Sequence, residues 1–317
     1  MNPRLDTLQP YPFEKLRLLL AQAGTPPAGL RAINLSIGEP KHAAPQCVKD
    51  AIVGALDGLS AYPPTKGDPK LREAISQWIG QRYGIPCPNP ETQVLPVLGS
   101  REALFSFAQV VLDSTKSGIV VCPNPFYQIY EGAALLGGAT PYYVNSDPAL
   151  NFGCDWSTVP SEIWARTQLL FVCSPGNPAG NVMNLAEWRT LFELSDRYGF
   201  VIASDECYSE IYLDEALPPL GGMQAAVQLG RTDFRNLISF SSLSKRSNVP
   251  GMRSGFVAGD AALIKQFLLY RTYHGSVMST VVQAASIAAW DDEDHVRDNR
   301  EQYRSKFAQV TPILSQV

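Results

Sequence analysis

An amine, several hydroxyls and a guanidinium lie close together in the stretch SFSSLSKRSNVPGMRSGFVAG, residues 239–259. Lys245 stands among serines just after an apolar run, and Arg253 follows it in a glycine-rich segment. An amine can form a Schiff base with a carbonyl compound, and hydroxyls together with a guanidinium can hold a phosphate. These residue types predict a site for a carbonyl compound that carries an anionic group.

Polar clusters follow five apolar runs of the chain. Because the carboxyl ends of parallel strands meet at one edge of a sheet, we expect these clusters to share one pocket. The runs and the residues after them are VLPVL (94–98) with Gly99-Ser100-Arg101-Glu102, GIVVC (118–122) with 123–127, LLFVC (169–173) with 174–180, FVIAS (200–204) with Asp205-Glu206-Cys207-Tyr208, and LISF (237–240) with the serines and Lys245.

The clusters together offer the contacts of one cofactor. A serine at a helix start, Ser100, suits a phosphate, and Asp205 at a strand end can pair with a protonated heterocyclic nitrogen. Tyr127 can stack on a flat ring, while Tyr208 and Asn177 can hydrogen-bond a ring oxygen. Phosphate, pyridinium nitrogen, phenolic oxygen and an aldehyde that reacts with lysine together describe pyridoxal 5′-phosphate.

The elements that must position these residues alternate between strand-like and helix-like segments. Apolar runs bounded by glycine or proline, without polar alternation, predict strands buried on both faces. Helix patterns begin at Ser100 and near Tyr127, and another covers about Leu185 to Tyr198. Helical crossovers imply a mostly parallel sheet. The sequence therefore predicts an α/β domain whose mostly parallel sheet is flanked by helices.

Composition limits the partners and the location. The chain has 317 residues, of which 45% are hydrophobic and 18% charged, and its formal net charge is −4. This charge gives no electrostatic reason to expect nucleic acid or an anionic membrane as a partner. The first residues contain no apolar run of the signal-peptide type, and no stretch approaches the ~18 apolar residues of a membrane span. A cytoplasmic protein is expected.

Cysteine and histidine spacing gives no indication of a metal site. The six cysteines form no C-x-x-C pair, and the three histidines are scattered along the chain. We therefore expect no zinc site. Cys122 and Cys173 close strand-like runs and are expected to be small buried thiols.

Ordered motifs resemble those of a known family. SPGNPAG, SDECYSEIY and SLSKRSNVPGMRSG, supported by NLSIGEP (34–40) and AYPPTKGDPKLREAI (61–75), are similar to the motifs of fold-type I, class I/II aminotransferases. That family depends on pyridoxal 5′-phosphate. The resemblance covers residues 1–317. More narrowly, QPYPFEKL, LPVLGSREALFSF, PNPFYQIYEGA and FLLYRTYHGSVMS resemble the bacterial N-succinyldiaminopimelate aminotransferases of lysine and diaminopimelate biosynthesis.

The resemblance implies a role for each matching residue. Lys245, Asp205 and Tyr208 are the implied catalytic residues. Lys245 forms the Schiff base and later moves the substrate proton, and Asp205 keeps the pyridine nitrogen protonated. Asn177 and Tyr208 are implied to contact the ring's 3′-oxygen, and Tyr127 to stack on the ring. The implied phosphate contacts are Ser100, Arg101 (mainly through its backbone N–H), Ser242, Ser244 and Arg253, with Tyr62 reaching the phosphate of the neighbouring subunit in a homodimer. Gly38 and Asn177 are implied to contact the substrate.

Each of these residues also has a structural interpretation. A lone lysine such as Lys245 is usually solvated, Asn177 can be a turn residue, and Asp205 can cap a helix. The tyrosines can be packing aromatics. Their joint occurrence, in order, at successive strand ends favours the cofactor interpretation. Arg246 and Asn248 receive no role beyond loop structure.

The resemblance also implies a division into domains. Residues 1–45 are expected to belong with a small domain, residues 46–285 to form the large cofactor-binding domain, and residues 286–317 to begin a C-terminal small domain. In the family, that domain carries an arginine for the substrate α-carboxylate. No residue here matches this arginine, so we expect a truncated chain with an incomplete substrate site.

Three functions remain open from the sequence. The first is transamination between L-glutamate/2-oxoglutarate and N-succinyl-2-amino-6-oxopimelate, with N-succinyl-LL-2,6-diaminopimelate as the amino product. The second is transamination of another acidic or aromatic amino acid. The third is a fragment that binds the cofactor but is inactive. Loop sequences do not separate the first two functions, whereas a spectrum recorded after adding glutamate would separate the third.

Overall fold

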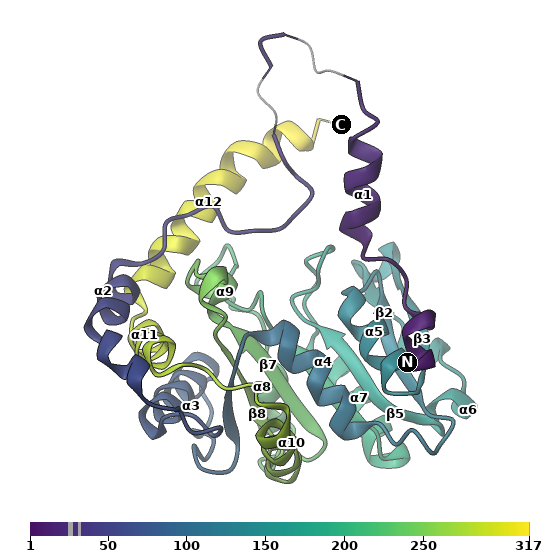
Figure 1. Cartoon of the computed structure of the whole chain (residues 1–317). Helices are drawn as coiled ribbons and strands as arrows, with labels where there is room; N and C mark the ends of the chain where they lie inside the picture. Colours follow the sequence, from purple (N-terminus) through teal and green to yellow (C-terminus); the bar gives the residue numbers. More distant parts are fainter. Residues whose placement is uncertain (25–27, 31–32, 317) are drawn as a thin grey trace.

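An eight-stranded sheet forms the centre of the chain in the computed structural model (Figure 1). The structure describes residues 1–24, 28–30 and 33–316. The strand order is β1-β8-β7-β6-β5-β2-β3-β4. The strands are β1 (Val94–Val97), β2 (Ile119–Asn124), β3 (Thr140–Asp147), β4 (Gly153–Cys154), β5 (Thr167–Cys173), β6 (Val201–Asp205), β7 (Leu237–Ser242) and β8 (Gly255–Gly259).

Most neighbouring strands run parallel. The pairs β2–β3, β2–β5, β5–β6 and β6–β7 are parallel, and β4 is antiparallel to β3. Strand β8 is antiparallel to both β7 and β1, so β1 runs in the same direction as β7. The carboxyl ends of β1, β2, β5, β6 and β7 therefore lie along one edge, together with the amino end of β8.

Helices cover both faces of the sheet. Helices α4, α5 and α10 pack on one face, where Phe107, Tyr130 and Phe267 are fully buried. Helices α3, α7, α8 and α11 pack on the other, around Trp78 and Trp188. The helices are α1 (Pro12–Leu20), α2 (Gln46–Gly54), α3 (Pro69–Tyr83), α4 (Ser100–Val111), α5 (Gln128–Leu136), α6 (Ser161–Trp164), α7 (Leu185–Tyr198), α8 (Gly222–Gln228), α9 (Leu243–Arg246), α10 (Ala261–His274), α11 (Thr280–Trp290) and α12 (Asp294–Leu314).

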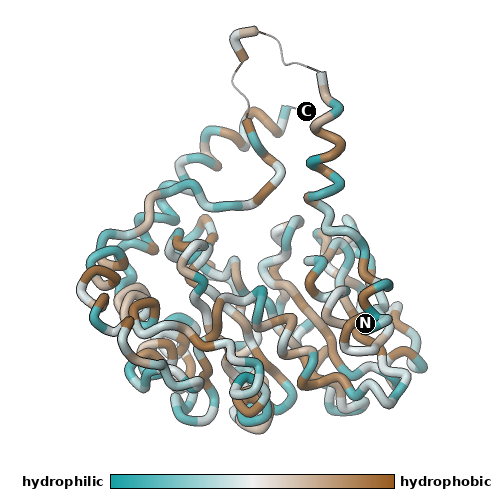
Figure 2. Tube along the Cα trace, viewed as in Figure 1, coloured by the Kyte–Doolittle hydropathy of each residue, from teal (hydrophilic) through white to brown (hydrophobic). Residues whose placement is uncertain are grey.

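Local sequence signals set several of these boundaries. Asn184 and Glu187 form a capping box at the start of α7, and Gly199 ends that helix in the left-handed conformation at φ +80°. Both devices satisfy backbone groups that a helix end leaves without partners. The central strands are the hydrophobic segments between helices in Figure 2, and β6 is buried along its whole length. Each fully buried large apolar side chain contributes about 1.5–3 kcal/mol.

The expected elements are found, and three strands are additional. The five apolar runs are β1, β2, β5, β6 and β7, and the expected helix over Leu185–Tyr198 is α7. Strand β3 was missed because its sequence, TPYYVNSD, mixes exposed and buried residues near the sheet edge. Strand β8 was missed because GFVAG has glycine at both ends and follows a glycine-rich loop.

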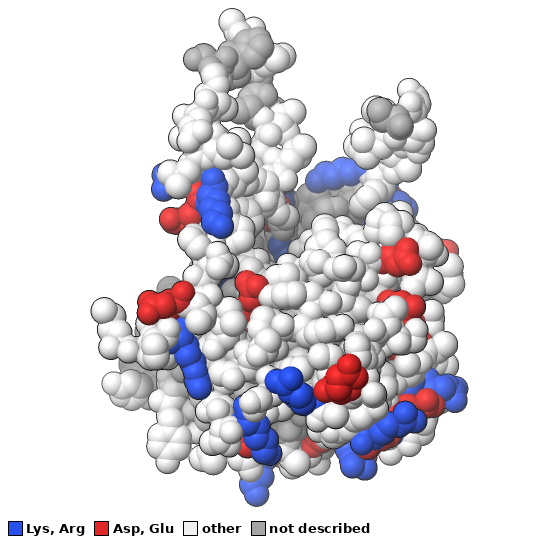
Figure 3. Space-filling model, turned by 90° about the vertical axis from the view of Figure 1, so that its right-hand side faces the viewer, with Lys and Arg blue, Asp and Glu red and all other residues white. Residues whose placement is uncertain are grey.

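Two segments extend beyond the layered domain on the side of the polar strand ends. Helix α12 and part of residues 1–45 lie above the carboxyl edge of the sheet in Figure 1. On the face shown in Figure 3, the blue Lys and Arg side chains are interspersed with the red Asp and Glu side chains. Within the described residues, every helix is too short or too polar to cross a membrane.

Candidate active site

The amine of Lys245 points toward the loop that contains Gly38. Lys245 lies in the one-turn helix α9, directly after β7. Its Nζ donates a hydrogen bond to the carbonyl oxygen of Gly38 and lies 5.9 Å from the centre of the Tyr208 ring. Burial lowers the pKa of Lys245. A lowered pKa increases the fraction of neutral amine, which is the form that attacks a carbonyl.

Asp205 ends β6 as a buried carboxylate, with 6% of the residue exposed. Its Oδ2 accepts a hydrogen bond from the Tyr130 hydroxyl at 2.7 Å, and its Oδ1 accepts one from the Cys207 N–H at 3.3 Å. Burial raises the pKa of Asp205 despite these hydrogen bonds, which act in the opposite direction. A cationic partner would stabilise the ionised form of this buried carboxyl, and a protonated ring nitrogen is such a partner.

An amide and a phenol from two neighbouring strand ends meet beside this carboxylate. Asn177 Nδ2 lies 3.3 Å from the Tyr208 hydroxyl, to which it donates. Burial raises the pKa of Tyr208, so its hydroxyl stays protonated and can donate to a ligand oxygen. The Tyr127 ring meets Tyr130 edge-on, with centroids 5.9 Å apart, and burial raises the pKa of Tyr127 to about 12. Both phenols are therefore neutral over a wide pH range.

Two serines from different strand ends lie on either side of the Cys207 thiol. Cys207 Sγ donates to Ser100 Oγ at 2.9 Å, and Ser242 Oγ donates to Cys207 Sγ at 3.8 Å. Ser100 is the first residue of α4, and its N-cap Gly99 has no side chain to cap the helix. A ligand anion can bind the N–H groups of such a helix end. The arrangement favours a phosphate at this corner.

Arg253 adds a guanidinium to the same corner. Its φ is +56°, in the left-handed region, and it precedes the antiparallel strand β8. A Cβ built on Gly99 would lie 2.6 Å from Arg253 Nη2, so the guanidinium occupies space that a side chain at residue 99 would take. Within the described chain, Arg253 donates to the carbonyl oxygens of Pro250 and Leu98, at 3.0 Å and 3.4 Å. Its charge therefore remains available to an anionic ligand.

The side chains of Arg101 and Tyr62 are exposed, whereas the Arg101 N–H, the contact expected for that residue, lies in the first turn of α4 beside Ser100. The Arg101 guanidinium lies 5.3 Å from the centre of the Tyr11 ring. Its charge also acts to lower the pKa of Tyr127, which places it near that phenol. Ser244 is partly buried within α9, and Tyr62 is fully exposed in this single chain. The fold thus collects Lys245 with the other strand-end residues and keeps the Arg101 N–H at the start of α4, while the side chains of Arg101 and Tyr62 lie on the surface.

Tyr130 and Cys207 are residues of the site that the sequence did not reveal. Tyr130 is fully buried and stacks on Phe171, with centroids 4.4 Å apart. Tyr127 is the N-cap of α5 and Tyr130 lies three residues later in its first turn, and this short spacing from an expected site residue was the available signal. Cys207 had no comparable signal because a single cysteine beside an acid is common in cores.

The structure brings together three possible metal ligands that are distant in sequence. The ligand atoms of Cys47, Asp292 and His295 lie within 4.8 Å of one another. Cys47 Sγ donates to Asp292 Oδ2 at 3.4 Å, and His295 Nδ1 lies 3.0 Å from the same oxygen. Sequence spacing alone could not reveal this cluster. Cys47 and His295 both bond to Asp292, and these contacts join α2 to the start of α12.

The donor set at the carboxyl edge fits pyridoxal phosphate. It contains a carbonyl-reactive amine, a buried carboxylate, an amide–phenol pair and an anion-binding corner. The close approach of Gly99 and Arg253 is the sharpest indication, because it leaves a guanidinium beside an uncapped helix end. These groups match the aldehyde, ring nitrogen, phenolic oxygen and phosphate of that cofactor.

Comparisons with known proteins agree with this fit. A family model described as aminotransferase class I and II matches residues 31–317. An aminotransferase structure from Neisseria meningitidis Z2491 matches with a TM-score of 0.96 and 56% identity, over 100% of this chain and 80% of that one. The 4-dedimethylamino-4-oxo-anhydrotetracycline transaminase OxyQ of Streptomyces rimosus is 33% identical over 93% of this chain and 76% of its own length. The LL-diaminopimelate aminotransferase of Aquifex aeolicus is 29% identical, over 100% and 80% respectively.

Proposed function

This chain belongs to the class I and II aminotransferase family, and on that premise we propose that Lys245, Asp205 and Tyr208 are its catalytic residues. The enzyme depends on pyridoxal 5′-phosphate, which, when bound, supplies an electron sink for the charge that develops on the substrate α-carbon. One observation carries the proposal. At one edge of the sheet, an amine, Lys245, and a buried carboxylate, Asp205, stand at the ends of the neighbouring strands β7 and β6, beside the Asn177–Tyr208 pair. Burial disfavours the charged form of both groups, which lowers the pKa of Lys245 and raises that of Asp205, and groups perturbed in this way cluster at functional sites.

Each residue has a distinct task in this proposal. Lys245 Nζ would hold the cofactor through its carbonyl group and, as the neutral amine, would move the proton of the substrate α-carbon. Asp205 would keep the ring nitrogen protonated, and Tyr130 fixes the orientation of that carboxylate. Asn177 and Tyr208 would donate to the phenolic oxygen. The serine and arginine donors at the start of α4 and β8 hold the phosphate, which keeps the reacting atoms beside Lys245.

For the substrates, we propose L-glutamate/2-oxoglutarate as one pair and N-succinyl-LL-2,6-diaminopimelate/N-succinyl-2-amino-6-oxopimelate as the other. Several relatives at 27–29% identity are named LL-diaminopimelate aminotransferases, which supports a diaminopimelate skeleton. Arg101, beside Tyr11 and near Tyr127, can pair with a distal carboxylate. The alternative is another acidic or aromatic amino acid, since relatives at about 30% identity are named for different substrates, as OxyQ is for an anhydrotetracycline.

For the assembly, we propose a homodimer in which Tyr62 reaches the neighbouring site. Tyr62 is fully exposed, and Val53, Leu56 and Leu59 are exposed apolar side chains in the preceding segment. Such grouping is typical of an interface. We also propose that residues 1–45 and 286–317 belong with a smaller domain beside the large domain, residues 46–285. Contacts between His42 and α12 support this association of the two ends.

A half-reaction tests the proposed chemistry. The chain loaded with pyridoxal phosphate should release 2-oxoglutarate from L-glutamate in one equivalent per site, even without an acceptor. Lys245→Ala should release none and should yield no borohydride-fixed cofactor peptide at position 245. Release of 2-oxoglutarate by Lys245→Ala at the unsubstituted rate would contradict the assignment.

A comparison of substrates tests the finer proposal. We expect kcat/KM to be highest for N-succinyl-LL-2,6-diaminopimelate among that compound, LL-diaminopimelate, L-aspartate and L-phenylalanine. Arg101→Ala should lower kcat/KM for the succinylated substrate by roughly tenfold or more, because a charge-assisted pair is lost, and should leave L-phenylalanine nearly unaffected. A higher value for phenylalanine or aspartate would favour the alternative.

A further inference from the structure

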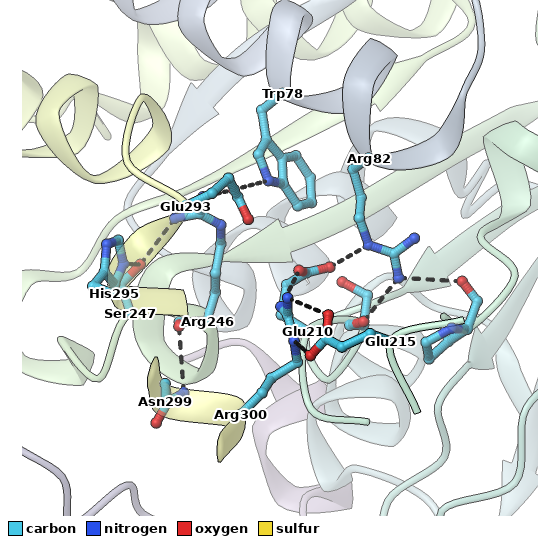
Figure 4. A network of polar contacts seen from close by, with 12 residues as sticks. Trp78, Arg82, Glu210, Glu215, Arg246, Ser247, Glu293, His295, Asn299 and Arg300 are labelled. Atoms are coloured by element: carbon cyan, nitrogen blue, oxygen red, sulfur yellow. Dashed lines mark hydrogen bonds and ion pairs between the residues drawn. The ribbon is translucent and has the colours of Figure 1, made fainter. Parts of the chain in front are cut away.

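Residues at the start of α12 contact the segment that carries Lys245 and the loop after Tyr208 (Figure 4). Glu293 is the N-cap of the helix, and His295 and Asn299, four residues apart within it, share a face. The contacts involve both ion pairs and neutral hydrogen bonds. The pairs are Glu293 with the Arg246 guanidinium, His295 Nε2 with Ser247 Oγ at 2.8 Å, Asn299 Oδ1 with Asn248 Nδ2 at 2.9 Å, and Arg300 with Glu215 at 2.8 Å in the loop after Tyr208.

Asn299 is the residue of α12 that reaches the lysine itself. It is buried, with 1% exposure, and its Nδ2 lies 3.5 Å from the carbonyl oxygens of Lys245 and Arg246. These two carbonyls end the one-turn helix α9, where the helix itself provides no N–H donors for them. Asn299 therefore caps α9 from a neighbouring helix. The same amide accepts from Asn248 through Oδ1, so both of its ends hold the lysine segment.

Asn299 thus has two sets of contacts, here called arms. The first is its bonds to the Lys245 and Arg246 carbonyls, and the second connects it through His42 to the Gly38 loop, which receives the lysine amine. Asn299 Oδ1 lies 2.6 Å from His42 Nδ1, and Lys306 Nζ approaches the other ring nitrogen of His42. Since an ammonium can only donate, Nε2 accepts and Nδ1 carries the proton that Asn299 accepts. His42 lies four residues after Gly38, whose carbonyl accepts from Lys245 Nζ. These contacts close a ring. Asn299 Nδ2 contacts the Lys245 carbonyl oxygen, Asn299 Oδ1 contacts His42, and the chain from His42 leads back to Gly38, whose carbonyl oxygen accepts from Lys245 Nζ.

We propose that Asn299 is a positioning residue for Lys245. Its Nδ2 fixes the backbone from which the amine extends, and its Oδ1 fixes the end of the loop toward which the amine points. This inference rests on the proposed catalytic role of Lys245. Displacing a reacting group by about 1 Å can cost on the order of 100-fold in rate, so one buried amide that sets both reference points has a large effect.

The geometry also connects the site to the outer part of α12. Beyond Arg300, most residues of this helix are exposed, and the helix extends away from the sheet in Figure 1. A tilt of the helix would therefore reach the Lys245 backbone through Asn299 and the Gly38 loop through His42. A residue that only filled buried space would have no such effect on the amine.

Two substitutions break the two arms separately. Asn299→Asp keeps the size and the acceptor for Asn248 and His42, but it replaces the donor that caps Lys245 with an oxygen. His42→Phe removes the bond to Asn299 and keeps a flat ring against Tyr303, whose centroid lies 4.7 Å from that of His42. Gln302→Ala, at an exposed position of the same helix, is the matched control.

The first readout is the reactivity of Lys245 in the full chain without cofactor. Labelling by an amine-specific reagent, followed by peptide mass spectrometry across pH, reports the titration of this amine. In Asn299→Asp the midpoint should move to higher pH, because the released lysine loses the burial that lowers its pKa and because the new carboxylate favours the ammonium. His42→Phe should shift the midpoint less in the same direction, and Gln302→Ala should not shift it. His42→Phe adds no charge, so its shift reports the loss of position alone. The cofactor-loaded Asn299→Asp enzyme should lose about 10- to 100-fold in kcat, with a smaller change in KM.

The outcomes separate this inference from the proposed function. Unchanged labelling midpoints and kcat in both Asn299→Asp and His42→Phe would overturn the positioning role. If Asn299→Asp fails to fold, His42→Phe alone decides, since His42 is only partly buried. Transaminase activity retained in Lys245→Ala would instead overturn the proposed function. If Lys245→Ala loses activity while Asn299→Asp and His42→Phe keep the labelling midpoint and kcat of the unsubstituted chain, only the inference about Asn299 is overturned.

Discussion

Two consecutive carboxylates, Asp205 and Glu206, are both buried but have different surroundings. Their exposures are 6% and 2%. Asp205 accepts one strong hydrogen bond, from Tyr130 at 2.7 Å, and one weak bond from a backbone N–H at 3.3 Å. Glu206 accepts four strong bonds. Its donors are the Tyr83 hydroxyl at 2.7 Å and, each at 2.9 Å, Ser204 Oγ, Ser239 Oγ and the Gly222 N–H.

The difference follows from the faces to which the two side chains point. Successive side chains at a strand end lie on opposite faces of the sheet. Asp205 meets α5 on the face that also carries α4, whereas Glu206 meets α3 and the start of α8 on the other face. Burial therefore does not distinguish a functional carboxylate from a structural one. Hydrogen-bond saturation does, because only Asp205 retains capacity for a cationic ligand.

Asp205→Asn should give the largest effect on activity in this comparison. The substitution keeps the shape and an acceptor for Tyr130, but it removes the negative charge. We expect kcat to fall by roughly 100- to 1,000-fold, as for the loss of an electrostatic partner at a reacting group. Steady-state transamination with glutamate measures it. A decrease of less than about tenfold would place Asp205 with Glu206 as a structural carboxylate.

Glu206→Gln should lower stability and leave activity nearly unchanged, the opposite of what we expect for Asp205→Asn. The substitution replaces one of the two carboxylate oxygens, which together accept from four donors, by an amide NH₂. At least one buried donor therefore loses its partner. We expect the free energy of unfolding to fall by about 1–3 kcal/mol. Urea unfolding measures this loss. In molecules that remain folded, kcat should change by less than about threefold, and a larger change would mean that Glu206 also acts in catalysis.

Tyr130→Phe tests how firmly Asp205 is oriented. The change removes the hydroxyl that donates to Asp205 Oδ2 and preserves the ring stacked on Phe171. A single hydrogen bond of this kind contributes about 1 kcal/mol, so we expect a decrease in kcat of roughly fivefold. The pKa of Asp205 should rise further, because this bond acts to lower it. An unchanged kcat would show that the carboxylate is held without Tyr130.

The pH dependence of stability should give the smallest effect. Burial raises the folded-state pKa of Asp205, whereas the unfolded chain has the ordinary value of about 3.9. In the cofactor-free chain, the contribution of Asp205 is therefore fully present below pH ~3.9 and is lost as the pH rises through the raised folded pKa. The stability of the unsubstituted chain relative to Asp205→Asn should decline across this window. A relative stability that increases with pH would contradict the raised pKa.

The sequence predicted much of the fold because its signals were local. Strands buried on both faces require unbroken apolar runs, and five of these runs are strands of the sheet. Helix α7 has the predicted bounds because Asn184 and Gly199 carry its end signals. Strand β8 could not be predicted in this way, since the antiparallel pairing that makes GFVAG a strand comes from β1 and β7. Its position brings Arg253 to the same edge as the strand ends.

The sequence by itself determined which groups stand at the strand ends, and therefore the kind of ligand that the site suits. Lys245, Asp205 and Asn177 each follow an apolar run, and parallel pairing brings such ends together. Only the tertiary structure decided the partners of these groups. Tyr130 joins Asp205 and Asn299 caps the backbone of Lys245 across long separations in the chain. Such contacts depend on strand order and helix packing, which bury side chains from distant segments against one another and which no local pattern specifies.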